Sequence, residues 1–394
     1  MGNVPNLRFP EFTEVWKVER LDEIATLSKG VGISKEQLSN DGEPCILYGE
    51  LYTKYKSEII KEIDSRTNID NSKLKRSKAN DVIIPCSGET AIDIATARCV
   101  PFDNILLGGD LNIISLYQYD GAFMSYQLNG KRKYDIAKVA QGVSVVHLYG
   151  EHLKAIFTYN PCLQEQQKIA QILSLLDERI ATQNKIIDKL KSLIKGLSQQ
   201  LLSSENDWIL YRLDDLAQIK SGYSGTQVGY QTPYKVSRIE TISKHCVDIQ
   251  RIGYVEYISE SYKLNVGDIL FSNINSVQYI GNTAYLDKDY GLYHGMNLLR
   301  IIPNTTIVRP RFLHLLLCTD WAINHFQTIC NKAVSQASIN QTALGKSRLP
   351  IPPMSIQQQI CSMFELTERK LNNEEKYRGY LQQQKWYLLQ QMFI

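Results

Sequence analysis

Four residues in the second half of the chain have side chains that bind metal ions in many proteins. They are His314, Cys318, His325 and Cys330, spaced four, seven and five residues apart. Zinc sites usually draw ligands from close pairs such as Cys-x-x-Cys, and these spacings fit no such pattern. The surrounding residues 312–329 are apolar enough to form a buried helix, in which His and Cys pack as core residues. We therefore expect ordinary packing and no metal site.

Two short motifs are similar to parts of catalytic sites. Residues 159–162 read Tyr-Asn-Pro-Cys, a partial match to the Asn-Pro-Pro-Tyr motif of amino-methyltransferases that lacks the second proline and the aromatic residue. Glu368 and Lys370 form a Glu-x-Lys pair such as nucleases use, but they lie in a charge-rich helical segment where a solvated face is the ordinary explanation. Neither a P-loop nor a Gly-x-Gly-x-x-Gly loop after a strand is found. The sequence therefore predicts a protein without a catalytic centre, metal or cofactor of its own.

Basic and hydrogen-bonding side chains are the remaining chemical signal. Residues 73–78 read Lys-Leu-Lys-Arg-Ser-Lys, residues 131–133 read Lys-Arg-Lys, and further Lys and Arg residues are spread over residues 235–311. Tyrosine is abundant, with 23 residues against 10 phenylalanines. Tyr, Arg, Asn, Gln and Ser are side chains with which proteins contact bases and phosphates. A solvated charged face explains any single cluster equally well, so the clusters alone leave the choice open.

The bulk properties set few limits on function. A chain of 394 residues is long enough for two or three domains, and a net charge of +3 points to no particular partner. We expect no signal peptide, lipid anchor or membrane span, because the first residues show neither targeting pattern and no apolar run approaches roughly 18 residues. The eight cysteines are scattered without Cys-x-x-Cys pairs. This usage indicates reduced thiols and a cytoplasmic protein.

The chain contains an internal repeat. Residues 16–30 (WKVERLDEIATLSKG) match residues 208–222 (WILYRLDDLAQIKSG) in the Trp, the Arg-Leu-Asp triplet and the final Gly. Residues 80–84 (NDVII) are similar to 267–271 (GDILF), and residues 161–180, which begin PCLQEQQKI, are similar to 352–371, which begin PPMSIQQQI. The middles of the two halves do not match. A duplication whose two copies are similar at their ends and different in their middles indicates two similar modules with different targets.

The segment after residue 161 has a heptad pattern of apolar residues. Their spacings alternate between four and three, with Gln183 at the one missing step. A pattern sustained over about four and a half repeats is typical of a coiled coil or helical bundle. The predicted packing residues are Ile169, Leu173, Leu176, Ile180, Ile187, Leu190, Ile194, Leu197 and Leu201.

The matching segment at the end of the chain has a weaker pattern. Four of its ten seam positions are polar or charged, so it would be a poor coiled coil alone and is expected to pack antiparallel against the first helix. About forty residues at 1.5 Å each make a rod of roughly 60 Å, which predicts two modules held apart by a stiff spacer. Its predicted packing residues are Ile360, Phe364, Leu371, Leu381 and Leu388.

These features predict an α+β protein in four parts. Two α/β modules, at residues 1–158 and 206–349, are separated by a pair of long antiparallel coiled-coil helices at residues 159–205 and 350–394. The duplication makes the arrangement pseudo-twofold. Short β-type runs at residues 81–85, 113–117, 267–271 and 298–302 support mixed α/β modules, and residues 312–329 are expected to be helical.

On these motifs the sequence resembles the specificity (S) subunits of type I restriction–modification systems over nearly its whole length. The most specific features are the two Pro-x-x-x-x-Gln-Gln-x-Ile helix starts, at residues 161–169 and 352–360, each preceded by a variable module. Residues 357–359 read Gln-Gln-Gln where the family often has Glu-Gln, which is one departure. The resemblance implies that each module is a target recognition domain for one half of a split DNA site, and that the helices set the spacing between the halves.

The resemblance also implies partners. Two methyltransferase (M) subunits would dock on the helices and carry S-adenosylmethionine. Restriction (R) subunits, which hydrolyse ATP, would join through the core of two M subunits and one S subunit. The S chain would bind double-stranded DNA and hold no cofactor itself.

Under this resemblance, loops rich in polar and basic residues are the candidates for DNA contact. In module one they are Lys29, Gly30, Ser87, Thr90, Arg98, Lys131, Arg132, Lys133, Gln141 and Ser144. In module two they are Ser221, Tyr223, Ser272, Asn273, Asn275, Gln278, Ser335 and Gln336. Neutralising residues 131–133 is expected to flatten the salt dependence of DNA binding.

Two other functions fit the same motifs. One is a protein–protein adaptor with two binding modules on a coiled-coil spacer, and the other is a catalytic methyltransferase or nuclease. Selection of a split sequence from random DNA distinguishes the adaptor, and cross-linking to S-adenosylmethionine distinguishes the enzyme.

Overall fold

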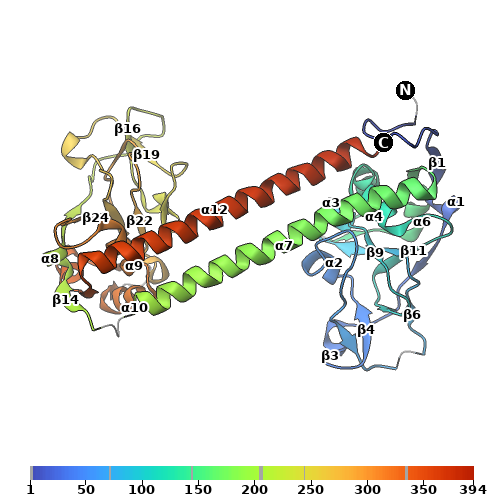
Figure 1. Cartoon of the computed structure of the whole chain (residues 1–394), viewed down its shortest axis with the longest axis horizontal. Coiled ribbons are helices and arrows are strands. Elements are labelled where there is room, and N and C mark those ends of the chain that lie inside the picture. Colours follow the sequence, from blue (N-terminus) through green and yellow to red (C-terminus); the bar gives the residue numbers. More distant parts are fainter. Residues whose placement is uncertain (1–2, 71, 143–144, 204–206, 244, 333–335) are drawn as a thin grey trace. The chain divides into compact units, whose positions relative to one another are not determined.

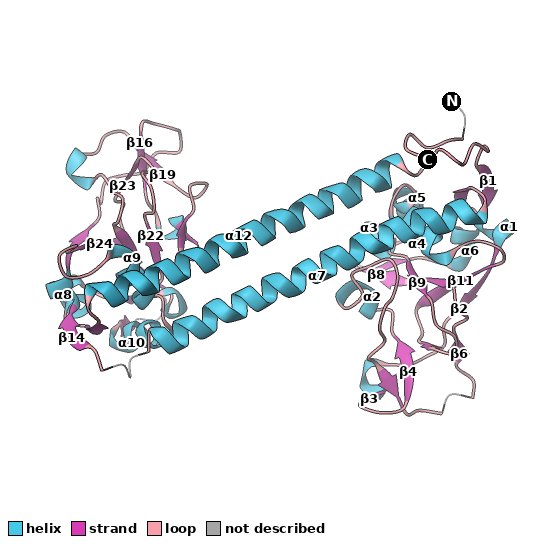
Figure 2. Ribbon diagram, viewed as in Figure 1, coloured by secondary structure: helices cyan, strands magenta, loops and turns pink. Residues whose placement is uncertain are grey.

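The chain forms two compact units in a computed structural model (Figure 1). The structure describes every residue except 1–2, 71, 143–144, 204–206, 244 and 333–335. Unit 1 consists of Met1–Lys185 and Glu375–Ile394, and unit 2 of Ile186–Glu374. Each unit therefore combines one globular module with part of both long helices, α7 (Leu163–Leu201) and α12 (Met354–Gln391), which Figure 2 shows as uninterrupted.

Module one is built around an antiparallel sheet of four strands. Their order is β2 (Ala25–Lys29), β11 (Leu111–Leu116), β7 (Asp81–Pro85) and β9 (Arg98–Val100). A mixed sheet has the order β3 (Leu38–Ser39), β5 (Arg66–Thr67), β4 (Glu43–Ile46), β10 (Leu106–Leu107) and β6 (Lys75–Arg76). Two ribbons pair β1 (Lys17–Arg20) with β13 (Phe157–Asn160) and β8 (Ser87–Gly88) with β12 (Val146–His147). The helices are α1 (Leu21–Ile24), α2 (Glu50–Thr53), α3 (Ala91–Ile94), α4 (Gly121–Asn129), α5 (Lys133–Val139), α6 (Gly150–Lys154) and the 3-10 turn η1 (Lys35–Gln37).

Strand β7 is buried along its whole length and forms the centre of module one. Val82 and Ile84 pack into the cluster that contains α4 and α6, whereas Ile83 packs into a second cluster on the opposite face. This burial of both faces explains why residues 82–85 form a continuous apolar run instead of an alternating one.

Module two repeats this architecture. Its antiparallel sheet has the order β15 (Ala217–Ser221), β24 (Leu298–Pro303), β20 (Ile269–Ser272) and β22 (Thr283–Tyr285). A three-stranded sheet contains β19 (Gly253–Val255), β16 (Tyr234–Val236) and β23 (Leu292–Tyr293), and ribbons pair β14 (Ile209–Arg212) with β27 (Arg348–Ile351) and β17 (Ile242–Ser243) with β18 (Cys246–Val247). A small sheet has the order β21 (Ile274–Asn275), β26 (Ala337–Ser338) and β25 (Asn331–Lys332). The helices are α8 (Leu213–Leu216), α9 (Pro310–Leu317), α10 (Asp320–Ile329), α11 (Gln341–Gly345) and the 3-10 turns η2 (Ile239–Thr241), η3 (Glu260–Tyr262) and η4 (Val277–Tyr279).

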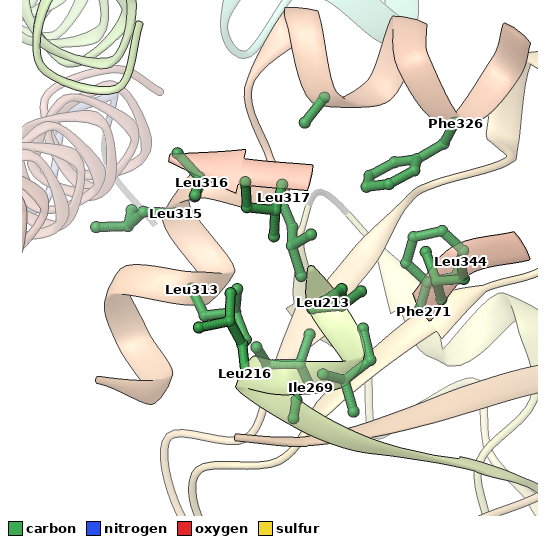
Figure 3. Close-up of a cluster of buried hydrophobic side chains, with 14 of the residues drawn as sticks. Leu213, Leu216, Ile269, Phe271, Leu313, Leu315, Leu316, Leu317, Phe326 and Leu344 are labelled. Carbon is green, nitrogen blue, oxygen red and sulfur yellow. The ribbon is translucent and has the colours of Figure 1, made fainter. Parts of the chain in front are cut away.

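The core of module two lies between its four-stranded sheet and helices α9 and α10 (Figure 3). Phe271 and Phe326 meet edge to face, with ring centroids 5.1 Å apart. Residues 312–329 are helical as predicted, and they form two helices, α9 and α10, separated at Cys318 and Thr319. Thr319 starts the second helix, since its side chain accepts a hydrogen bond from the Ala322 N–H as an N-cap.

The duplication is visible in local detail as well as in strand order. Asn80 and Gly267 occupy matching turns and both have positive φ, 80° and 95°. The aspartates that follow them act alike, because Asp81 accepts a hydrogen bond from the Lys78 N–H and Asp268 from the Asn265 N–H. The repeated sequence therefore encodes the same turn before the central strand of each module.

The repeated Pro-x-x-x-x-Gln motif has a structural cause. Gln166 is buried at the start of α7, where its amide donates to the Pro161 carbonyl and accepts from the Asp120 N–H. Gln357 makes the same pair of bonds at the start of α12, to the Pro352 carbonyl and from the Arg309 N–H. Each glutamine thus fixes a long helix to the module that precedes it.

In unit 1, α7 and α12 pack antiparallel beside module one. Leu173 of α7 shares a cluster with Met392 near the end of the chain, and further along α7 Asn184 contacts Arg378. The predicted seam residues Ile169, Leu173, Leu176 and Leu381 are buried, while Ile180 and Leu388 are half-buried.

In unit 2 both helices pack against module two. Ile360 and Phe364 of α12 belong to the module-two core. Ile194, Leu197 and Leu201 of α7 pack on it while half-buried. Ile187 is buried, and Leu190 and Leu371 are half-buried.

Candidate nucleic-acid interface

One edge of the module-one sheet gathers several of the predicted contact residues. Strands β2 and β7 both pair antiparallel with β11, so they run parallel to each other and their carboxyl ends lie at the same edge. Lys29 ends β2 and is exposed, with its ammonium 3.5 Å from the Asp110 carboxylate. Ser87 follows β7 at the same edge.

The ribbon of β8 and β12 extends this edge. His147 pairs with Ser87, and its N–H and carbonyl each bond to Gln141, at 2.7 and 2.9 Å. Gln141 is exposed. Lys29, Ser87 and Gln141, which are far apart in the sequence, are therefore brought to one edge of the module.

Two other predicted residues at this edge have backbone roles. Gly30 is buried, and a Cβ there would lie 2.0 Å from the Gly108 carbonyl oxygen, so only glycine fits. Thr90 caps α3 by accepting a hydrogen bond from the Asp93 N–H. These two residues shape the loops beside Lys29 and Ser87.

The corresponding edge of module two gathers its own candidates. Strands β15 and β20 both pair antiparallel with β24, so Ser221 and Ser272 end parallel strands at the same edge. Ser221 is exposed, and its hydroxyl accepts a hydrogen bond from Gln341 at 2.9 Å. Tyr223, two residues further on, is half-buried and meets Tyr262 edge to face at 5.5 Å.

The remaining candidates of module two differ in the exposure of their side chains and in the internal hydrogen bonds that these side chains make. Asn275 donates to Ser272 and accepts from the Ser276 N–H, and Ser272 is buried. Asn273 pairs with the backbone of Ile339, which lies next to β26. Among the candidates of module two that the structure describes, Ser221, Gln278 and Gln336 are exposed.

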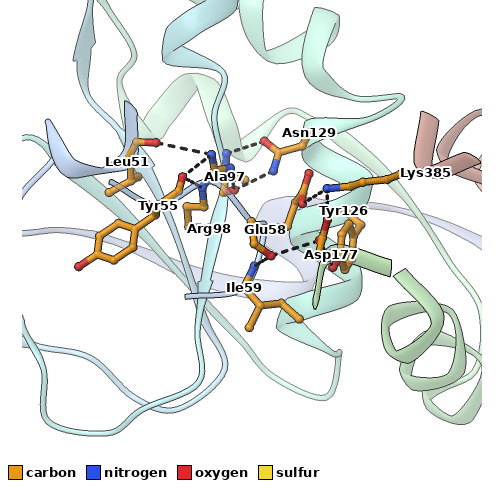
Figure 4. Close-up of polar contacts among 11 residues, drawn as sticks. Leu51, Tyr55, Glu58, Ile59, Ala97, Arg98, Tyr126, Asn129, Asp177 and Lys385 are labelled. Atoms are coloured by element: carbon orange, nitrogen blue, oxygen red, sulfur yellow. Dashed lines mark hydrogen bonds and ion pairs between the residues drawn. The ribbon is translucent and has the colours of Figure 1, made fainter. Parts of the chain in front are cut away.

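Arg98 lies inside module one (Figure 4). Its guanidinium donates to the carbonyls of Tyr55, Ala97 and Leu51, at 2.9 to 3.5 Å, and burial lowers its pKa. Because these carbonyls occupy its donors, the geometry favours a structural role for Arg98.

The basic cluster at residues 131–133 is also partly committed to internal contacts. Arg132 donates to the Ile394 carbonyl at 3.0 Å, pairs with Asp135 and lies 5.0 Å from the centre of the Tyr159 ring. Burial lowers the pKa of Lys133. Arg132 thus ties the end of the chain to module one. Two further candidates, Ser144 and Ser335, lie outside the described residues.

Sequence reasoning missed His147, Tyr149 and Gln341, which lie at these edges. Val146 and Leu148 are buried while His147 and Tyr149 are exposed, as in a half-buried strand. The alternation Val-His-Leu-Tyr is present in the sequence and could have revealed these residues.

The residues considered for a metal site do not assemble into one. Cys318 lies 3.3 Å from His245 and 3.4 Å from His314, but His325 bonds to Ser347 elsewhere. Burial lowers the pKa of His314 to about 3 and raises that of Cys318 to about 12, so both are neutral near pH 7. Within the described part of the chain, no three His, Cys, Asp or Glu side chains are placed to hold a metal ion.

The two charged side chains of the Glu-x-Lys motif lie in different environments. Glu368 receives two hydrogen bonds from Arg311, at 2.5 and 2.7 Å, whereas Lys370 is exposed. Glu368 therefore joins α12 to α9 of module two.

Among the described residues, none of the helices combines the length and apolar character needed to cross a membrane.

Comparison with models of protein families shows to which family the chain belongs. The family model for the type I restriction modification DNA specificity domain matches residues 13–192 and again residues 205–378. The chain belongs to this family. As a specificity subunit it carries two target recognition domains, and the two matched segments correspond to the two halves of the internal repeat.

Two relatives come from Methanocaldococcus jannaschii. The putative type I restriction enzyme MjaX specificity subunit is 42% identical over 164 residues, which span 40% of this chain and 39% of that relative. The type I restriction enzyme MjaVIII specificity subunit is 22% identical over an alignment covering 96% of this chain and 91% of that relative. The higher identity is thus confined to part of the chain.

Solved structures show the same fold over almost the whole length. The S subunit of the type I restriction–modification system from M. genitalium matches with a TM-score of 0.62 at 16% identity, covering 99% of both chains. A chain from a study of complex assembly and conformational transition in a type I system matches with a TM-score of 0.60 at 15% identity, covering 97% of this chain and 98% of that one.

Proposed function

We propose that each recognition domain reads one half of a split double-stranded DNA site through the sheet edge described above. The observation that carries this proposal is the construction of the same edge twice, at the carboxyl ends of β2 and β7 and of β15 and β20, with different exposed side chains. Lys29 of module one corresponds to Ser221 of module two. Such a pair of readers distinguishes two unlike sequences.

The catalytic steps belong to partner subunits in this proposal. Two M subunits supply S-adenosylmethionine and methylate the DNA, and R subunits, which use ATP, join through the core of two M subunits and one S subunit. This chain supplies sequence recognition and the scaffold, with no catalysis of its own. The buried neutral state of His314 and Cys318 and the pairing of Glu368 with Arg311 support this assignment.

Helix α12 offers a surface for an M subunit. Tyr380 and Trp386 are each 65% exposed, and Tyr377 and Tyr387 are also exposed on the same part of the helix. Aromatic side chains that remain this exposed on one helix mark an interaction site. We assign M-subunit docking to these four residues.

The direct test is selection from random DNA. The purified chain, assembled with its methyltransferase partner, is expected to enrich two short defined sequences separated by a spacer of fixed length. Enrichment of no sequence, with the assembled complex intact, would overturn the proposal and favour the adaptor function.

A second test addresses spacing. Removing seven residues from α7 (186–192) and the seven opposite them in α12 (369–375) keeps the heptad register and shortens both helices by about 10 Å. This length corresponds to about three base pairs at 3.4 Å each, so the preferred spacer is expected to shorten by about three base pairs. An unchanged spacer preference in an assembled complex would contradict the spacing role of the helices.

A further inference from the structure

In module one, residues 146–149 present a fixed row of side chains. Val146 and Leu148 point into the core, and His147 and Tyr149 point outward. Both backbone groups of His147 are bonded to Gln141, and β12 pairs with β8 on the other side. The outward row is therefore held by the backbone on both sides.

The two outward rings also contact each other. The imidazole of His147 stacks on the Tyr149 ring with centroids 6.2 Å apart and planes inclined by 25°. Tyr149 is 53% exposed. An exposed pair of stacked aromatic rings has few conformations to lose on binding, and this low entropy cost is a property of recognition side chains.

Module two has the same row in the same register. Residues 337–340 correspond to 146–149, because Ser338 pairs with Ile274 as His147 pairs with Ser87. Ala337 and Ile339 are buried like Val146 and Leu148. The outward positions carry Ser338 and Asn340, and Asn340 caps α11 by accepting from the Ala343 N–H.

The inward residues of the two rows are alike in kind, whereas the outward residues differ. Inward positions are constrained by the core in both modules. The core does not constrain the outward positions, where module one places two aromatic rings and module two places Ser338 and the α11 N-cap Asn340. A difference confined to the solvent side of a rigid ribbon is expected where each module contacts a different base sequence.

We propose that His147 and Tyr149 determine which bases module one reads, and that Ser338 is their counterpart in module two. This inference rests on the proposed function and names the side chains that carry it. The imidazole N–H and the tyrosine hydroxyl supply hydrogen bonds to base edges, and their rings contact the methyl group of thymine. Ser338 supplies one hydroxyl, which is compatible with several bases.

Exchange of matching residues tests the proposal in the full chain assembled with its methyltransferase partner. His147→Ser and Tyr149→Asn introduce the residues of module two, and asparagine remains suitable as the N-cap of α6. Ser338→His is the reciprocal change. Val146→Ala, which introduces the buried Ala337 of module two, is the matched control on the inward side of the same strand.

Each protein is used to select DNA from a pool randomised in both halves. His147→Ser and Tyr149→Asn are each expected to change the preference at one or more positions of one half-site by about tenfold and to leave the other half unchanged. Ser338→His is expected to alter only the other half. Val146→Ala should leave both half-sites as in the wild type.

The outcomes separate the inference from the proposed function. If the wild type selects a split sequence and the outward variants that fold select the same one with unchanged preferences, the assignment of these residues is overturned while the proposed function stands. If the wild type selects no sequence, the proposed function falls and the inference falls with it. Circular dichroism identifies any variant that does not fold, and the reciprocal change in the other module then decides.

Discussion

Replacing Lys385 by methionine is expected to loosen the end of α12 from module one. The ammonium of Lys385 lies 2.6 Å from the Glu58 carboxylate and 2.7 Å from that of Asp177, and the three side chains are only 16, 11 and 8% exposed (Figure 4). Tyr126 and Ser57 donate to the same Asp177 oxygen at 2.7 and 3.1 Å. The cluster joins α12, α7 and module one, all within unit 1.

The magnitude follows from what the substitution leaves behind. Methionine fills similar volume but leaves Glu58 and Asp177 buried without their cation. Removal of one partner from a buried ion pair typically costs about 3–5 kcal/mol, because the remaining charge stays desolvated. Neutralising all three positions, with Glu58→Gln and Asp177→Asn added to Lys385→Met, is expected to recover most of that loss, since neutral replacements of buried ion pairs are often close to neutral in stability.

The loss is also expected to depend on pH. In the wild type, burial raises the pKa of Glu58, and Lys385 opposes that rise. Without Lys385 the pKa of Glu58 in the folded protein lies higher still above its unfolded value. When the pKa of a carboxyl group is higher in the folded protein than in the unfolded chain, the group stabilises the fold most at pH values below its pKa in the unfolded chain. That stabilisation is lost as the pH rises through its pKa in the folded protein. The variant should therefore be closest to the wild type near pH 4–5 and weakest at pH 8.

Urea unfolding combined with amide hydrogen exchange measures both effects. Exchange should accelerate in residues 378–391, and the unfolding midpoint should fall. Lys376→Met on the exposed surface of the same helix is the matched control and should change stability by no more than about 0.5 kcal/mol. A Lys385→Met protein as stable at pH 8 as the wild type, or a triple variant no better than the single one, would refute the reasoning.

Two further predictions follow from the helix starts and the sheet edge. Gln166→Leu and Gln357→Leu should each lower the free energy of unfolding in urea by about 1–3 kcal/mol, because the Asp120 or Arg309 N–H loses its acceptor. If both variants were as stable as the wild type, the anchoring role of the two glutamines would be contradicted. Lys29→Gln should lower the slope of log affinity against log salt concentration by about 1, whereas Arg98→Gln should lower stability and leave the slope unchanged. If salt titrations of DNA binding showed a lower slope for Arg98→Gln and an unchanged slope for Lys29→Gln, Arg98 and not Lys29 would lie at the interface.

The frame of the fold was predictable because its signals are local. Residues 81–85 form a strand as expected, since a short apolar run between turn residues indicates a buried strand. Residues 312–329 are helical as expected, and the break between the two helices lies at Thr319, a capping residue. Arg98 was predicted as a base contact because it lies in a segment expected to be a loop rich in polar and basic residues. Its partner carbonyl on Tyr55 lies 43 residues away in the sequence, so no local pattern shows that its donors are occupied.

Lys385, one of the polar residues on the seam of α12, has a structural explanation. A heptad of apolar residues fixes which face of a helix is buried but tolerates a shift by seven residues, because the pattern repeats. Lys385 removes this freedom: a shift in one direction would bring Met392 to its position and leave two buried carboxylates without a cation. A shift in the other direction would bring Arg378 there but would withdraw Met392 from the cluster around Trp16. The buried charge and the packing of Met392 together therefore favour one register of α12 in unit 1, at the cost of a weaker apolar seam.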